Sequence, residues 1–224
     1  MRPRPRLVTA FAGMVTVATL VTACGTGDGW SQPHTGLTAV GTLGTGFVPS
    51  GAPPSPEATI VPLPGSWDEI RPSKGYRVVL LTSGDDRPTE ALATAVRQWA
   101  DDEHVDLRTV AAMDVTDLVP SISSAIEMGP DLVVSAGSDL VDPLALVTAS
   151  HLDQQFLVVG AEIAEPTHNV TAVDWSGASF RGEGLGTSST YDPDSFTAER
   201  CAAAVRAGVA AVLGEVTGIV VWLD

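Results

Sequence analysis

Short apolar runs alternate with polar segments along the chain from about residue 75. Val78–Leu81 is an apolar run with the length and β-branching of a strand buried on both faces. Small polar residues follow at Thr82–Asp86 and suit a tight turn, and Pro88 suits the first turn of a helix. The stretch Gly75–Pro88 therefore predicts the first strand, loop and helix start of an α/β sheet.

The alternation continues towards residue 224. Further strands are expected at 105–110, 131–137, 156–160, 169–174 and 219–223, and helices at 88–102, 115–126, 140–151 and 195–213. Pro120 lies inside the second helical pattern and predicts a kink or a late start there. The Gly-, Ser- and Thr-rich residues 176–194 are expected to form a turn, a short helix near Phe180 and a loop.

Short strands that alternate with helices predict an α/β fold, a doubly wound and mostly parallel sheet of about six strands. The strand at 219–223 is expected to close this sheet at its edge. Residues 67–224 are assigned to this domain, and they are numerous enough to bury a core of their own.

Residues 1–23 have the pattern of a signal peptide. A basic start with Arg2, Arg4 and Arg6 precedes the uncharged run Leu7–Val21, which has the length of a signal-peptide apolar region. The run ends in Val21–Cys24 (VTAC), which resembles a bacterial lipobox. We expect lipidation of Cys24 and anchorage to the extracytoplasmic face of the cell membrane. An ordinary secretory signal with a coincidental cysteine, or a short signal anchor, is the alternative.

Residues 24–66 show no apolar periodicity. They are rich in Gly, Thr, Ser and Pro, including Pro53–Pro56 and Pro62–Gly65. This composition is typical of flexible spacers, so a tether between the membrane and the domain is predicted.

Charge narrows the range of partners. The formal net charge is −15, and it becomes −18 without Arg2, Arg4 and Arg6. Lys74 is the only lysine, and no basic patch is present. Nucleic acid is therefore not expected as a partner, and attachment to a membrane would depend on the lipid rather than on basic residues.

The reactive residue types are few. Cys24 and Cys201 are the only cysteines, so a lipidated Cys24 leaves Cys201 without an intramolecular partner, and Cys201 is expected to be a small buried side chain in a helix. His104, His151 and His168 are separated and lack metal-ligand spacing. We expect no metal site, no cofactor and no enzymatic activity, although a hydrolase built on a flavodoxin-like sheet is a minor alternative.

Candidate ligand-binding residues follow three predicted strands. In parallel sheets these strand ends share one edge, where such folds bind ligands. Each candidate also has a structural interpretation, because Asp, Ser and Gly favour turns and helix caps and a Trp can cover a sheet end. The candidates are Ser83, Asp85 and Asp86 in the first loop, Gly137, Ser138 and Asp139 in the third, and Asp174 and Trp175 after the fifth strand.

Three stretches carry a family resemblance. Asp131–Gly137 (DLVVSAG), then Gln155–Glu162 (QFLVVGAE) and Asn169–Val173 (NVTAV) resemble the first lobe of the basic membrane protein family, over about residues 75–185. Members of that family are lipid-anchored, type I periplasmic-binding-protein-like receptors of ABC importers, and nucleosides are their best-known ligands.

The resemblance implies a solute-binding lobe with a nucleoside-like ligand and an ABC permease as partner. Two features depart from the family. Asp85–Asp86 continue into Arg87–Glu90 rather than into a Ser-Phe-Asn-type segment, and Ser135–Ser138 lack an aromatic residue. The chain also suits one lobe rather than two, which implies weak binding. The alternative is an interaction module for another envelope protein that has lost ligand binding.

Overall fold

The computed structural model describes residues 30, 39–49, 53–164, 166–178 and 190–224. The chain divides into two compact units, Met1–Pro33 and His34–Asp224, and every helix and strand described below lies in the second unit. The expected signal peptide and Cys24 lie outside the described residues.

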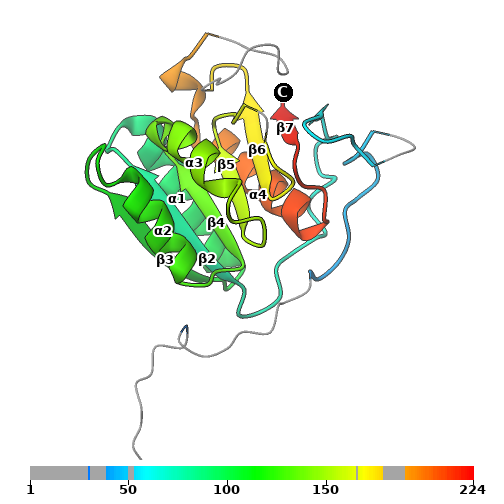
Figure 1. Ribbon diagram of the computed structural model, residues 1–224. Coiled ribbons are helices and arrows are strands. Elements are labelled where there is room, and N and C mark those ends of the chain that lie inside the picture. The colour runs from blue at the N-terminus through cyan, green and yellow to red at the C-terminus, as the bar shows by residue number, and fades with distance from the viewer. Residues whose placement is uncertain (1–29, 31–38, 50–52, 165, 179–189) are drawn as a thin grey trace, which may run out of the picture. The chain divides into compact units, whose positions relative to one another are not determined.

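The second unit is a three-layer α/β domain (Figure 1). Its strands are β1 (Thr59–Ile60), β2 (Arg77–Ser83), β3 (Asp106–Ala112), β4 (Leu132–Ala136), β5 (Gln155–Val159), β6 (Val170–Trp175) and β7 (Val220–Leu223). Its α-helices are α1 (Arg87–Asp102), α2 (Leu118–Glu127), α3 (Val141–Thr148) and α4 (Ala198–Leu213), with short 3-10 turns η2 (Ser138–Leu140) and η3 (Pro193–Ser195).

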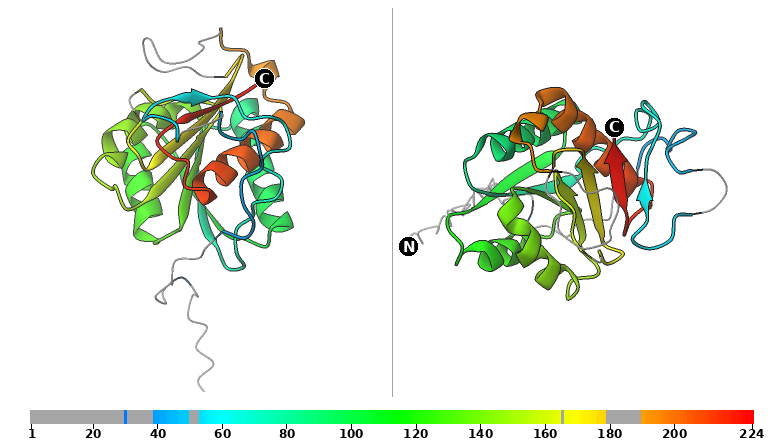
Figure 2. Two further views of the ribbon diagram at one scale, coloured as in Figure 1. Left: turned by 90° about the vertical axis from the view of Figure 1, so that its right-hand side faces the viewer. Right: turned by 90° about the horizontal axis from the view of Figure 1, so that it is seen from above.

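All the strand pairings within the sheet are parallel, in the order β1-β7-β6-β5-β4-β2-β3. Helices α1 and α4 cover one face, and α2 and α3 cover the other (Figures 1 and 2). Strand β2 is buried on both faces: Val78, Val79, Leu80 and Leu81 are fully buried. The predicted doubly wound, parallel α/β fold is confirmed.

The sheet has seven strands, one more than expected. The seventh is β1, which lies in the segment predicted to be a flexible tether. Thr59 and Ile60 pair with Val220 and Val221, so β1 covers the edge that β7 would otherwise leave open. A strand of two residues is too short to show alternating polar and apolar positions, and its pairing partner β7 is more than 150 residues away in sequence. The sequence therefore gives no local sign of β1.

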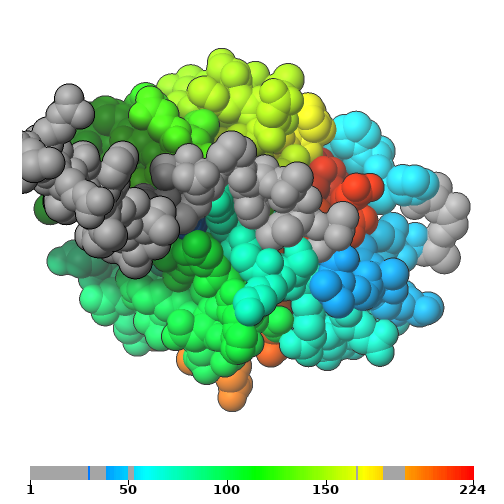
Figure 3. All heavy atoms as spheres, turned by 90° about the horizontal axis from the view of Figure 1, so that it is seen from below, coloured from blue at the N-terminus to red at the C-terminus, as the bar shows by residue number. Residues whose placement is uncertain are grey.

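The rest of the described segment before residue 67 is also packed on the domain. Phe47 is fully buried in the core, and Val40 forms an antiparallel bridge with Arg71. The backbone N–H of Leu63 donates to the carbonyl of Gly46 at 3.0 Å. In the view from below, these blue and cyan residues lie beside red residues from the last part of the chain (Figure 3). Residues 39–49 and 53–66 are therefore part of the folded unit rather than a spacer.

Two helix starts differ from the expected ones. Helix α2 begins at Leu118, so Pro120 sits in its first turn, which is the late start rather than the kink. Helix α4 begins after Thr197, whose side chain accepts a hydrogen bond from the Arg200 N–H at 3.2 Å. Residue 195, where the sequence predicts this helix to begin, belongs instead to the preceding turn η3.

Candidate functional site

The carboxyl ends of the strands form the candidate site. The chain passes from β2 through α1 to β3 on one side, and then returns through α2 to β4 on the other side of β2. This reversal makes the β2/β4 boundary the topological switch point, where ligands of open α/β sheets bind. The first and third candidate loops leave the sheet at this point.

The two loops are in direct contact, as their predicted adjacency requires. Ser83 ends β2 and is buried, and Gly137 follows β4 with a φ of 122°. A Cβ built on Gly137 would lie 2.5 Å from the carbonyl oxygen of Ser83. Only glycine fits at this position, because both the backbone conformation and the available space exclude a side chain.

The two acidic residues of the first loop have different environments. Asp86 caps α1: its Oδ1 accepts from the Thr89 N–H at 3.1 Å, and its Oδ2 accepts from the Thr89 hydroxyl at 2.8 Å. Pro88 lies in the first turn, as the sequence predicted. Asp85 is exposed at the loop tip. Asp86 is therefore engaged in helix capping, while the carboxylate of Asp85 faces solvent.

Ser138 and Asp139 are both exposed and form the start of η2. They lie in the short connection between β4 and α3, at the carboxyl edge of the sheet. Their position at the switch point agrees with the predicted placement, and whether they contact a ligand stays a prediction.

Aromatic residues fill the cleft behind these loops. The cleft is lined by Asp86, Gly137, Ser138, Gly160, Tyr191 and Phe196 among others. The rings of Tyr191 and Phe196 are 6.0 Å apart, and the remaining space is about 10 Å³, enough for about one water molecule. This conformation therefore has no room for a nucleoside or a sugar in the cleft.

Trp175 is part of the same aromatic group. It is fully buried, its ring lies edge-on to Phe196 at 5.0 Å, and its Nε1–H donates to the Ser195 hydroxyl at 3.0 Å. The ring has no exposed surface on which a ligand could stack, so in this structure Trp175 covers the end of the sheet. Asp174, by contrast, contacts a second buried carboxyl group, that of Glu162.

Asp174 and Glu162 form a buried carboxyl pair at the ends of β6 and β5. Glu162 is fully buried and Asp174 is 2% exposed. Both carboxylate oxygens of Glu162 and the Oδ1 of Asp174 are buried without a hydrogen-bond partner. Buried polar groups without partners are uncommon in folded proteins, so this pair needs a physical explanation.

Protonation explains how the pair is tolerated. Burial raises the pKa of Glu162 to about 7, and contact with Asp174 opposes part of that rise. Burial also raises the pKa of Asp174 to about 8; the backbone of Trp175 opposes the rise, and the charge of Glu162 adds to it. Near neutral pH the pair therefore holds at least part of its protons, and a neutral carboxyl both donates and accepts hydrogen bonds.

Glu162 was not among the candidates taken from the sequence. It lies three positions beyond the last residue of β5, outside the polar loops that directly follow the other strands. The sequence nevertheless indicates an acidic residue here, because Glu162 ends the motif Gln155–Glu162 at the same sheet edge as Asp174. Only the tertiary structure shows that both side chains are buried.

The described part of the chain holds neither a metal-ligand cluster nor a membrane-spanning helix. Within those residues, no three His, Cys, Asp or Glu side chains group in a way that would hold a metal ion. The helices α1 to α4 are all too short or too polar to cross a membrane.

No protein-family model matches the sequence, and no curated protein matches it. Among solved structures, an ABC transporter solute-binding protein from Aeropyrum pernix K1 is 20% identical, with a TM-score of 0.41 over 45% of this chain and 29% of that one. One from Conexibacter woesei DSM 14684 is 22% identical, with a TM-score of 0.39 over 46% of this chain and 36% of that one.

A third, an ABC transporter solute-binding protein from Bradyrhizobium sp. BTAi1 with bound Bis-Tris, is 14% identical, with a TM-score of 0.35 over 87% of this chain and 60% of that one. The chain thus spans about a third of the first two proteins, 29% and 36%. At these identities and TM-scores the likeness carries no argument about ligand or partner.

Proposed function

We propose that this protein is a lipid-anchored extracytoplasmic binding protein, and not an enzyme, whose single α/β lobe captures a small polar molecule for an ABC permease. The observation that carries the proposal is the buried Glu162–Asp174 pair at the carboxyl edge of the sheet. Both side chains are closed off from solvent in this conformation, so a ligand reaches them only when the cleft opens. Carboxyl groups at this edge then suit hydrogen bonding to hydroxyl or amine groups of a nucleoside-like ligand.

Thermal-shift measurements on the full chain in detergent test this function. Nucleosides, sugars and amino acids at millimolar concentration are expected to include at least one that raises the melting temperature. Glu162→Gln and Asp174→Asn should reduce that shift, while Asp153→Asn, at an exposed position just before β5 and so at the opposite edge of the sheet, serves as the control. If no compound raises the melting temperature, the receptor function is wrong.

The second candidate function is an envelope interaction module that binds no solute. The observation in its favour is the closed cleft, because small-molecule sites usually offer about 300–1,000 Å³ and only about 10 Å³ is open between Tyr191, Phe196 and the strand ends. The absence of any ligand-induced shift, together with specific cross-linking of the chain to another envelope protein in cells, would support this function over the first.

The lipid anchor has its own experiment. The basic start, the apolar run Leu7–Val21 and Cys24 occur in the order that a lipoprotein signal requires. Cys24→Ala is expected to move the protein from the membrane fraction to the soluble fraction. Retention of the variant in the membrane fraction would contradict lipidation, and Cys201→Ala is the matched control.

A further inference from the structure

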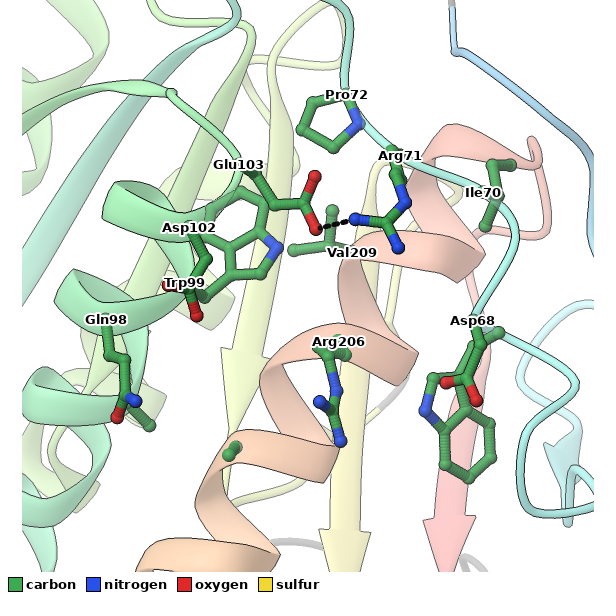
Figure 4. A pocket seen from close by; sticks show the side chains of 13 residues that line it. Asp68, Ile70, Arg71, Pro72, Gln98, Trp99, Asp102, Glu103, Arg206 and Val209 are labelled. Atoms are coloured by element: carbon green, nitrogen blue, oxygen red, sulfur yellow. Dashed lines mark hydrogen bonds and ion pairs between the residues drawn. The ribbon is translucent and has the colours of Figure 1, made fainter.

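A second hollow lies on the α1/α4 side of the domain and shares no lining residue with the strand-end cleft. Helix α1 begins at the carboxyl edge of the sheet, so its last turns, which line the hollow, lie towards the opposite edge. Three segments that are distant in sequence form its walls: residues 67–72, the second half of α1 and the middle of α4 (Figure 4). We call it the α1/α4 groove. Its volume is about 500 Å³, which is typical of a small-molecule site.

The floor of the groove is apolar and partly aromatic. Trp99 from α1, Val209 from α4, and Trp67 and Ile70 from the N-terminal segment all line it, and each is mostly buried. Aromatic and aliphatic side chains of this kind stabilise a bound ligand by removing its apolar surface from water.

One wall of the groove is held in place by an ion pair. The Nη1 of Arg71 donates to the Oε1 of Glu103 at 2.9 Å, and the Glu103 side chain is only 17% exposed (Figure 4). This pair ties the N-terminal segment to the end of α1. It also neutralises both charges, which leaves three other charged residues to recognise a ligand.

Those three residues are of both signs. Arg206 extends from α4 into the groove, and among the described residues it has no hydrogen bond or ion pair (Figure 4). Asp102 lies on the α1 side and Asp68 on the side of the N-terminal segment, and both are exposed. An arginine without a partner above an apolar floor is suited to a carboxylate, with which it forms two parallel hydrogen bonds.

We propose that the α1/α4 groove binds a small zwitterion with an apolar side chain, that is, an amino-acid-like ligand. Its carboxylate would pair with Arg206, its ammonium would face Asp102 on the α1 side, and its side chain would lie on Trp99 and Val209. A ligand with only a negative charge is disfavoured, because the chain carries a net charge of −15. This site is separate from the strand-end site of the proposed function.

Calorimetry and tryptophan fluorescence on the full chain in detergent test the proposal with three probes. L-phenylalanine should bind saturably, and 3-phenylpropionate and 2-phenylethylamine, which each lack one charge, should bind at least about tenfold more weakly. Arg206→Gln should weaken the binding of L-phenylalanine at least about tenfold and leave the affinity for 2-phenylethylamine unchanged. Arg206→Lys should restore part of the affinity.

The matched control is Arg97→Gln, which removes the same charge from an exposed position of α1 outside the groove. Its affinity for L-phenylalanine should equal that of the wild type. Glu162→Gln should also leave this affinity unchanged, which separates the groove from the strand-end site. The proposal is overturned if L-phenylalanine shows no saturable binding, or if Arg206→Gln binds it as tightly as Arg97→Gln does.

Discussion

Gly137 lies directly against the backbone of Ser83, so close that a Cβ at residue 137 would stand 2.5 Å from the Ser83 carbonyl oxygen. This contact joins the ends of β2 and β4 at the switch point of the sheet. The two loops can approach one another only because residue 137 has no side chain and accepts a φ of 122°.

Gly137→Ala is therefore expected to destabilise the domain by about 2–3 kcal/mol, from strain at positive φ and the clash with the Ser83 backbone. Gly129→Ala is the control, since Gly129 also has a positive φ of 64° but open space around its Cβ position. It should cost only about 1 kcal/mol in urea unfolding. Equal losses for the two variants would show that the Ser83 contact is unimportant.

The Glu162–Asp174 pair predicts a stability that falls as pH rises. In the folded state the pKa values are raised to about 7 and about 8 from ordinary values of 4.5 and 3.8. Below about pH 3, under both ordinary pKa values of 3.8 and 4.5, both groups are protonated whether the chain is folded or not. Between about pH 4 and pH 8 the unfolded chain releases protons that the folded chain keeps, so the free energy of unfolding decreases with rising pH.

Thermal melts between pH 5 and pH 8 measure this effect. Between its unfolded and its folded pKa, each carboxyl lowers the free energy of unfolding by about 1.4 kcal/mol per pH unit, so the melting temperature should fall by about 5 °C or more. Glu162→Gln and Asp174→Asn should each flatten the profile. A melting temperature that rises over this range in the wild type would contradict a protonated pair.

Asp85 and Asp86 are neighbours with different expected contributions to stability. Asp86→Ala removes both hydrogen bonds to Thr89 at the start of α1 and should cost about 1 kcal/mol. Asp85→Ala changes an exposed side chain and should stay within about 0.5 kcal/mol of the wild type. Urea denaturation of the two variants provides the comparison, and a reversed order would mean that the cap is wrongly assigned.

Phe47 tests whether the segment before residue 67 belongs to the domain. It is fully buried, so Phe47→Ala should lower the free energy of unfolding by about 3–5 kcal/mol. Leu63→Ala, at a side chain that is 62% exposed, should change it by no more than about 1 kcal/mol. A Phe47→Ala variant as stable as the wild type would restore the flexible-tether interpretation.

Cys201 is expected to be unreactive in the folded chain. It is fully buried in α4, and burial raises the pKa of its thiol to about 11. Ellman's reagent at pH 8 should detect no thiol at residue 201 before denaturation and one afterwards, because the reactive form is the thiolate. Cys201→Ala removes this signal and serves as the control. Rapid reaction of the native chain would show that α4 opens readily.

The sequence by itself determined the fold class, because its apolar runs are local and strong. Val78–Leu81 and Leu132–Ala136 read as buried strands without any tertiary information, and the capping chemistry of Asp86 and Pro88 marked the start of α1. The adjacency of the Ser83 and Gly137 loops also followed, since parallel strands bring their carboxyl ends to one edge.

Tertiary structure decided what depends on distant partners. Strand β1 forms because β7 would otherwise have an unpaired edge, and Phe47 is buried because it packs into the core cluster. Neither position has a local pattern in the sequence that predicts this. The same holds for the candidate sites. Only the folded chain brings Glu162 and Asp174 together as a buried pair and covers Trp175 with Phe196. Folding also places Arg206 beside residues 67–72 in one groove. Burial and pairing are properties of contacts between segments, and a residue's own neighbours in sequence do not encode them.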